Sequence, residues 1–215
     1  MTKKRKLHKT AEGKIFLVAN LMSLLLIGVI GYFAISNLEL TKALALIFIA
    51  HTLGGRAAGI GLCFVNEFGL FWTIFYNFYL EVVIVSWTYS LFVLSAQNYI
   101  QLRVVRFYSI KLERKARIHK DIIAKYGWFG VFMFVMTPLP ITGPVVGSII
   151  GYLLKFRILS NFSATFLGTL AAIVAWTYCF DFLNQHLHII QYVLIAIIVI
   201  VVLTYLKKIK NWITR

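Results

Sequence analysis

Residues 137–144 read TPLPITGP and contain Pro138, Pro140 and Pro144, which are all the prolines of this 215-residue chain. Apolar sequence lies on both sides, WFGVFMFVM over 128–136 and VVGSIIGYLL over 145–154. A helix needs about 20 residues to cross a bilayer, so each flank reaches only about half of the hydrocarbon depth. The prolines therefore mark a backbone turn inside a membrane, either in a kinked crossing or at the tip of a re-entrant hairpin.

The composition assigns the broad class of the protein. Hydrophobic residues make up 60% of the chain and charged residues 13%, and the mean hydropathy is +0.84. Such a composition, arranged in long apolar runs, predicts an all-α integral membrane protein. Four unbroken apolar segments are long enough to span: residues 15–35, 69–96, 158–180 and 188–206.

A second apolar segment is broken as well. Residues 43–65 are interrupted by Gly54, Gly55 and Arg56, so this segment presents the same alternatives as the proline segment. We expect both to be re-entrant hairpins, with Gly54, Gly55, Pro138, Pro140, Gly143 and Pro144 as the turn residues.

The distribution of charge favours the hairpins. The net charge is +15, and 20 of the 22 Lys and Arg residues lie in four clusters beside apolar segments. If both broken segments are re-entrant, all four clusters fall on one face of the membrane, as cytoplasmic loops do. If each broken segment instead crossed the membrane fully twice, the four clusters would still lie on one face. Only the shortness of the half-segments argues against this alternative. These positions favour a multi-pass cell-membrane protein with cytoplasmic termini and indicate no nucleic-acid partner.

The predicted layout repeats with inverted topology. Residues 43–96 form a hairpin and a span, and residues 127–181 form a second hairpin and span of opposite direction. Many secondary transporters are built from such inverted repeats with broken helices. The remaining predicted parts are a basic N-terminus (1–14), a first span (15–35), a linker (97–126), a last span (188–206) and a basic tail (207–215).

The linker predicts an interfacial helix. Ile100, Val104 and Tyr108 recur at helical spacing among basic residues. A basic amphipathic helix lying on anionic lipids explains this pattern without any role in substrate binding.

Arg56 and Glu81 are the main candidate site residues, because charges inside apolar segments are costly and usually functional. The guanidinium of Arg56 suits a phosphate or carboxylate, whereas a structural ion pair with Glu81 or Glu67 is the alternative. Glu81 could carry a proton or bind a cation, with Asn77 on the same helix face, or it could simply pair with Arg56.

His51 and Thr142 complete the set of substrate- or ion-binding candidates. His51 is either a proton relay or a packing residue. Thr142 could donate a hydrogen bond from the proline turn, which could otherwise be a purely structural elbow. The sequence has no nucleotide-binding, nucleophile-elbow or metal-binding motif, so we expect no cofactor, no metal and no enzymatic activity.

The proline region resembles the signature region of the small multi-drug export family over residues 125–172. Matching residues are Lys125, Tyr126, Gly127, Pro138, Leu139, Pro140, Thr142 and Gly143, with Gly168 in the following span. In the first hairpin Arg56 fits the family pattern, but the acidic residue and the proline that the family usually has there are absent.

This family is similar in plan to the DedA/VTT group, whose members have two re-entrant hairpins and are associated with proton-coupled movement of lipids such as polyprenyl phosphates. The resemblance implies a transporter of small molecules or lipid head groups, not driven by ATP and coupled to protons or cations. The expected partners are anionic lipids, a small-molecule or lipid-phosphate substrate and a second copy of the chain. A membrane scaffold or assembly factor is the alternative.

Overall fold

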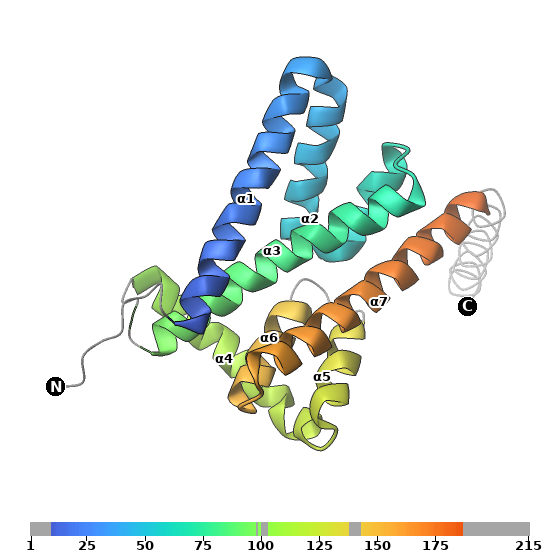
Figure 1. Cartoon of the computed structure of the whole chain (residues 1–215). Coiled ribbons are helices and arrows are strands. Elements are labelled where there is room, and N and C mark those ends of the chain that lie inside the picture. The colour runs from blue at the N-terminus through green and yellow to red at the C-terminus, as the bar shows by residue number, and fades with distance from the viewer. Residues whose placement is uncertain (1–9, 98, 100–102, 138–142, 187–215) are drawn as a thin grey trace, which may run out of the picture. The chain divides into compact units, whose positions relative to one another are not determined.

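The computed structural model describes residues 10–97, 99, 103–137 and 143–186, and the regular structure in these ranges is entirely helical (Figure 1). The helices are α1 (Ala11–Ser36), α2 (Leu38–Val65), α3 (Leu70–Ala96), α4 (Arg103–Ala124), α5 (Gly127–Met136), α6 (Gly143–Leu153) and α7 (Ile158–Gln185). By length and composition, α1, α2, α3 and α7 can each cross a membrane, and α5 and α6 are shorter apolar helices. The all-α membrane fold is therefore confirmed, whereas the re-entrant path and the inverted repeat stay predictions.

Helices α1 and α2 form a tight helical pair joined at Asn37. The Thr10 hydroxyl caps the start of α1 by accepting a hydrogen bond from the Gly13 amide (3.0 Å). The Asn37 side chain caps α2 in the same way, by accepting from the Leu40 amide (3.0 Å). Because one residue separates the helices, the chain reverses at once and α2 runs back beside α1 (Figure 1).

Helix α2 is broken at Gly55, inside the predicted glycine turn. Gly55 has φ 77° and ψ −175°, a backbone conformation that is essentially restricted to glycine. The two arms fold back on each other, because a Cβ placed on Gly59 would lie 2.9 Å from the Cβ of His51. In a straight helix, two residues eight positions apart, such as His51 and Gly59, would be separated by about 12 Å along the axis. The shape of α2 is thus that of a helical hairpin.

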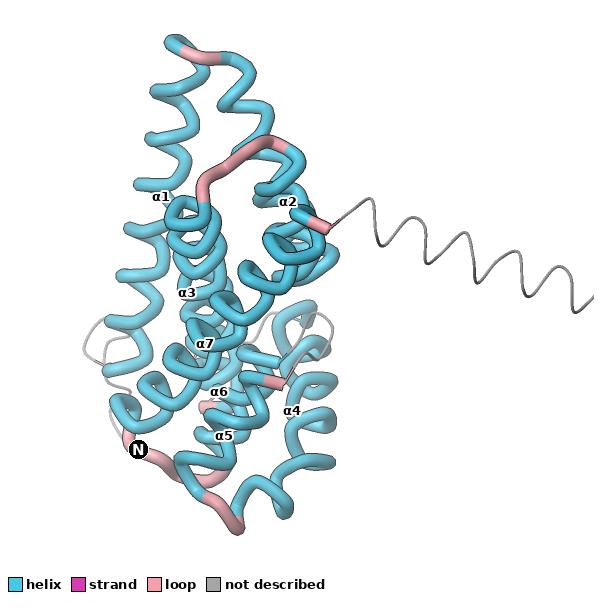
Figure 2. Tube along the Cα trace, turned by 90° about the vertical axis from the view of Figure 1, so that its right-hand side faces the viewer, coloured by secondary structure: helices cyan, strands magenta, loops and turns pink. Residues whose placement is uncertain are grey.

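Helices α5 and α6 form a second pair of short arms. Gly147 of α6 packs against Val131, Phe134 and Val135 of α5, and the two helices lie next to each other in Figure 2. They run in opposite directions, because a Cβ on Gly143 at the start of α6 would lie 3.7 Å from the Val135 carbonyl near the end of α5. Pro144 lies in the first turn of α6, where its missing amide hydrogen costs nothing. The predicted turn residues Pro138, Pro140 and Thr142 lie outside the described residues.

Helix α3 connects the two hydrophobic clusters of the core. Leu80 belongs to a cluster with Leu44, Ile47 and Cys63 of α2. Further along α3, Val85, Tyr89 and Phe92 belong to a second cluster with residues of α4, α5 and α6. Both helical hairpins are therefore packed against one helix, which fixes where their tips lie.

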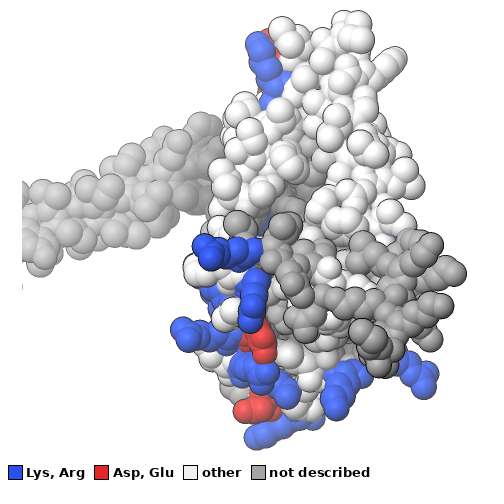
Figure 3. Space-filling model, turned by 90° about the vertical axis from the view of Figure 1, so that its left-hand side faces the viewer, with Lys and Arg blue, Asp and Glu red and all other residues white. Residues whose placement is uncertain are grey.

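Helix α4 lies within the predicted linker. Of the three residues on the predicted lipid-facing side, Tyr108 is exposed and Ile100 lies outside the described residues, so contact with lipid stays a prediction. The buried side of α4 carries Ser109, Ala116 and Ile123 and packs against α3, α5 and α6. The opposite side carries exposed basic residues, and Lys and Arg gather over this part of the molecule in Figure 3.

The chain divides into two compact units, Met1–Thr177 and Tyr178–Arg215. The described part of the second unit is residues 178–186, which includes the end of α7. The predicted last span (188–206) and basic tail (207–215) lie outside the described residues, as does most of the predicted basic N-terminus.

Gly55→Ala should destabilise the protein by about 1–3 kcal/mol, because alanine is strained at this backbone conformation. The measurement is the free energy of unfolding in detergent micelles. Gly28→Ala is the matched control, since a Cβ on Gly28 of α1 meets no atom within 4 Å and should leave stability unchanged or slightly higher. Equal stability of both variants would show that Gly55 is not held in this conformation.

Candidate functional site

Four of the predicted site residues meet between α2 and α3. His51 and Arg56 lie on either side of the Gly55 break, and Asn77 and Glu81 lie one turn apart on α3. All four side chains are buried, with exposed fractions of 3% for His51, 6% for Arg56, 0% for Asn77 and 6% for Glu81. A polar cluster at this depth is stable only if its members find partners.

His51 is held at both ring nitrogens. Its Nδ1 lies 2.9 Å from Asn77 Oδ1, and its Nε2 lies 3.2 Å from Glu81 Oε2. The amide nitrogen of Asn77 donates to the Thr73 carbonyl (2.8 Å) and also contacts Cys63 Sγ (3.3 Å). Asn77 Oδ1 is thereby left as the acceptor, so the Nδ1 of His51 must carry a proton and donate it.

This arrangement leaves one proton between His51 Nε2 and Glu81 Oε2. Either a protonated Glu81 donates to a neutral ring, or a charged ring donates to the Glu81 carboxylate. Both forms have no net charge, which is what a buried pair requires. The hydrogen-bonding partner of Glu81 among the described residues is His51, whereas Arg56 is a charged neighbour of Glu81 at the same cavity.

Gly59 makes this cluster possible, although the sequence analysis did not single it out. A Cβ on Gly59 would come within 2.8 Å of His51 Nδ1 and would also collide with Asn77 Oδ1. Only glycine lets the second arm of α2 approach the first arm and α3 this closely. In the sequence, this close approach was indicated only by the short spacing of Gly54, Gly55 and Gly59 within one apolar segment.

Arg56 connects the first hairpin with the second. Its Nη2 donates to the carbonyl of Val135 (3.0 Å), 79 residues away. Val135 lies in the last turn of α5, where carbonyls have no partner within the helix. The second guanidinium nitrogen, Nη1, is buried and has no hydrogen-bond partner among the described residues.

Gly143 lies directly beside Arg56. A Cβ there would be 3.0 Å from Arg56 Nη2. Gly143 and Pro144 are both buried at the start of α6. Of the turn residues predicted for the second hairpin, these are the two that the structure describes, and both lie at the cluster.

A small cavity lies between these groups. Its volume is about 30 Å³, and His51, Arg56, Glu81 and Pro144 contribute to its wall, with Thr52, Gly55 and Ile84. A cavity needs about 10–15 Å³ to hold one water molecule, so this one has room for little more than that. A larger ligand does not fit into this cavity as it stands.

The second half of the chain repeats one contact of the first. Asn161 of α7 donates to the Ser148 carbonyl (2.7 Å) and packs closely against Gly151 of α6. Asn77 packs against Gly59 in the same manner. In both halves, then, an asparagine on the long helix that follows the hairpin contacts a glycine of the second arm.

Helix α7 carries a stripe of buried polar atoms that the sequence analysis missed. Asn161 Oδ1 and the hydroxyls of Thr165 and Thr169 are buried without hydrogen-bond partners among the described residues. These residues are four apart and therefore share one helix face. Their spacing was visible in the sequence, but threonine in an apolar helix often bonds its own backbone and gives little signal.

The described residues contain no group of three His, Cys, Asp or Glu side chains that could hold a metal ion. The cluster can instead bind an anion at Arg56 and hold a proton between His51 and Glu81.

The pair of His51 and Glu81 should show strong coupling in a double-mutant cycle. His51→Leu and Glu81→Leu should each destabilise the protein by about 1–3 kcal/mol, because each leaves a buried polar group without its partner. The double variant should cost clearly less than the sum. Unfolding free energies in detergent provide the measurement.

Ser36→Leu combined with Glu81→Leu is the control cycle. Ser36 lies at the exposed end of α1, where its hydroxyl donates to the Tyr32 carbonyl (3.3 Å), and it does not line the cavity of Glu81. Additive energies in the His51 cycle, as in this control, would contradict the pairing.

Comparison with known proteins agrees with this architecture. A family model described as "Putative small multi-drug export protein" matches residues 56–175, more than half of the chain. The match begins at Arg56 and extends over both halves of the site. No curated protein and no solved structure matches the chain.

Proposed function

Because the chain belongs to the small multi-drug export protein family of membrane proteins, we propose that it is a transporter whose substrate site is the Arg56 cluster. The single observation that supports this most is the buried Arg56 Nη1, which has no partner among the described residues at a cavity between two hairpin tips. A buried guanidinium with an unused donor is suited to an anion that enters when the tips separate.

The proposed substrate carries a phosphate or carboxylate, as a small molecule or a lipid head group. Glu81 is occupied by His51 in the described structure, so no free carboxylate is left to attract a cationic drug. An anion could replace the Val135 carbonyl as the acceptor for Nη2 and also accept a hydrogen bond from Nη1, which would make a bidentate contact with Arg56.

Proton coupling follows from a count of charges. When the pair of His51 and Glu81 holds its shared proton, the cluster has one net positive charge, on Arg56. When that proton leaves, the cluster becomes neutral and attracts an anion less strongly. We propose that one proton moves with each anion and that ATP is not required.

Helix α4 is the proposed contact with anionic lipids. Its outer face combines exposed Phe107, Ile110 and Ile118 with Arg114 between them. Apolar side chains among cations are typical of a helix lying at a charged membrane surface. In the proposed topology α4 lies at the cytoplasmic face of the cell membrane, with both chain termini on the same side.

Arg56→Ala should abolish transport. The loss of a charge-assisted contact worth about 1.5–3 kcal/mol lowers anion affinity about 10- to 150-fold. The measurement is uptake or flipping of a fluorescent polyprenyl or phospholipid phosphate by the protein in reconstituted vesicles, with a cationic dye as the comparison substrate. Glu81→Gln should reduce transport and remove its dependence on a pH gradient.

Lys42→Ala is the matched control, because Lys42 is exposed and pairs only with Glu39 (3.0 Å). It should transport normally, and unfolding in detergent should show that all variants are folded. Full transport by both Arg56→Ala and Glu81→Gln would refute the proposal. Absence of transport in every vesicle preparation, with a folded chain, would favour a scaffold.

Cysteine labelling tests the proposed topology. After Cys63 and Cys179 are replaced by serine, Lys42→Cys should react with an impermeant maleimide from outside the cell. Gln97→Cys should react only after the membrane is opened. Labelling of position 42 from inside, or of position 97 from outside, would exclude two re-entrant hairpins with cytoplasmic termini.

A further inference from the structure

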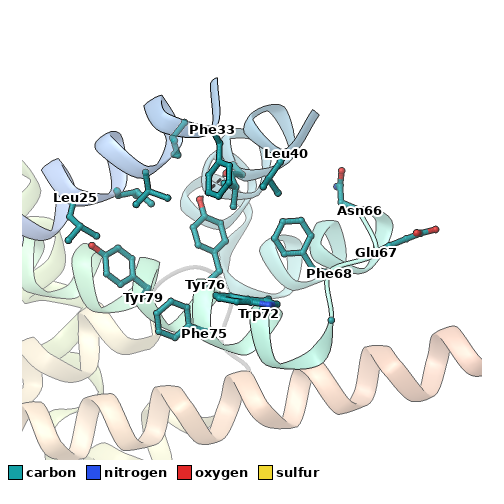
Figure 4. Close-up of a pocket in the computed structure, with 15 residues that line it drawn as sticks. Leu25, Phe33, Leu40, Asn66, Glu67, Phe68, Trp72, Phe75, Tyr76 and Tyr79 are labelled. Carbon is teal, nitrogen blue, oxygen red and sulfur yellow. Dashed lines mark hydrogen bonds between the residues drawn. The ribbon is translucent and has the colours of Figure 1, made fainter. Parts of the chain in front are cut away.

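A second and much larger hollow lies on the side of α1, α2 and α3, apart from the Arg56 cluster. Its volume is about 560 Å³, within the range of small-molecule sites. Phe33, Leu40, Trp72, Phe75 and Tyr79 surround it in Figure 4. None of the residues that line it belongs to the wall of the Arg56 cavity.

The wall of this groove offers almost nothing to a polar ligand. The Tyr76 hydroxyl already donates to the Leu44 carbonyl (2.9 Å), and the Tyr79 hydroxyl donates to the Met22 carbonyl (2.7 Å). The polar groups that remain are the indole N–H of Trp72 and the side chains of Asn66 and Glu67, and Figure 4 shows Asn66 and Glu67 pointing away from the hollow. A ligand that fills the groove is therefore predominantly apolar.

The surroundings of the groove identify that ligand. The three helices that form it are long and apolar enough to cross a membrane, so the medium beside them is hydrocarbon. An apolar hollow left empty would lose dispersion contacts along its whole wall, and lipid chains are the molecules at hand to restore them. The aromatic wall is ordered by its own ring contacts, with Trp72 and Phe75 edge to face at 6.0 Å.

The polar end of the groove matches the head of a lipid. Asn66 and Glu67 are exposed at the turn between α2 and α3. Exposed Glu39 and Lys42 lie at the start of α2, beside groove residue Leu40. The groove therefore has polar side chains at one end and an apolar wall along the rest, and a phospholipid has the same arrangement of a polar head and apolar chains.

We infer that this groove binds one hydrocarbon chain of a bilayer phospholipid, with the head group at the exposed polar end of the groove. The inference does not depend on transport at Arg56. A lipid held there would fill the space between α1 and the hairpin of α2 and so brace the hairpin against α3.

Val29→Trp and Leu25→Trp test the inference by filling the groove. Both residues line it from α1 and are exposed, Val29 by 41% and Leu25 by 59%, so a larger side chain should not disturb the core. Val18→Trp is the matched control, because Val18 lies on the same helix, is 55% exposed and does not line the groove. Each full-length chain is reconstituted in vesicles of phosphatidylethanolamine and phosphatidylglycerol, extracted in mild detergent and analysed by native mass spectrometry.

The unsubstituted chain and Val18→Trp should each retain one phospholipid. Val29→Trp and Leu25→Trp should retain it at least about tenfold less, which corresponds to the loss of about two buried methylene groups. A chain that retains no phospholipid, or equal retention by all variants, would overturn the inference. The same holds if Val29→Trp converts a dimer to a monomer, which would show a second copy in the groove. A disulfide between Val29→Cys and a cysteine scanned through residues 188–206 would place that segment there instead.

Discussion

Burial of the Arg56 guanidinium is the constraint on which the arrangement of the two hairpins depends. A guanidinium cannot lose its charge at any ordinary pH, so a buried one must find acceptors. Arg56 finds one in the Val135 carbonyl, at the end of a helix where that acceptor has no helical partner. Each hairpin thereby satisfies a group that the other leaves open, and the contact holds the two halves of the chain together.

The neighbouring pair of His51 and Glu81 is also buried, and it avoids an uncompensated charge in a different way. These two groups can exchange a proton, so they become neutral as a pair and need no further charge nearby. The orientation of the ring comes from Asn77, which is fixed in turn by the Thr73 carbonyl. A permanent charge and a neutral proton-holding pair consequently lie at one small cavity, and the net charge of that cavity depends on a single proton.

Local sequence predicted much of this fold, because the determining features are local. Long apolar runs gave the spanning helices, and the glycine and proline clusters marked where they break. The i, i+4 spacing of Asn77 and Glu81 placed them on one helix face, and both contact His51 in the structure.

The partners of these residues could not be predicted in the same way. Which group Glu81 contacts depends on how α2 folds back at Gly55, and Val135 meets Arg56 across 79 residues through a backbone carbonyl that no side-chain pattern reveals. The buried face of α4 was not predicted, for a related reason. Its periodicity is dominated by basic residues, whereas Ser109, Ala116 and Ile123 face the core at a spacing of seven.

The contacts also indicate where the proposed transporter can open. Between the first hairpin and α3, Gly59 and His51 are packed so closely against Asn77 that any relative movement would break several hydrogen bonds together. Between the hairpins, the contact of Arg56 is one hydrogen bond to a carbonyl, worth about 1.5–3 kcal/mol. An anion that takes over this donor and also uses Nη1 would compensate for the lost bond. The two hairpins should therefore separate as rigid pieces at Arg56, with the contact between His51 and Glu81 kept intact between the first hairpin and α3.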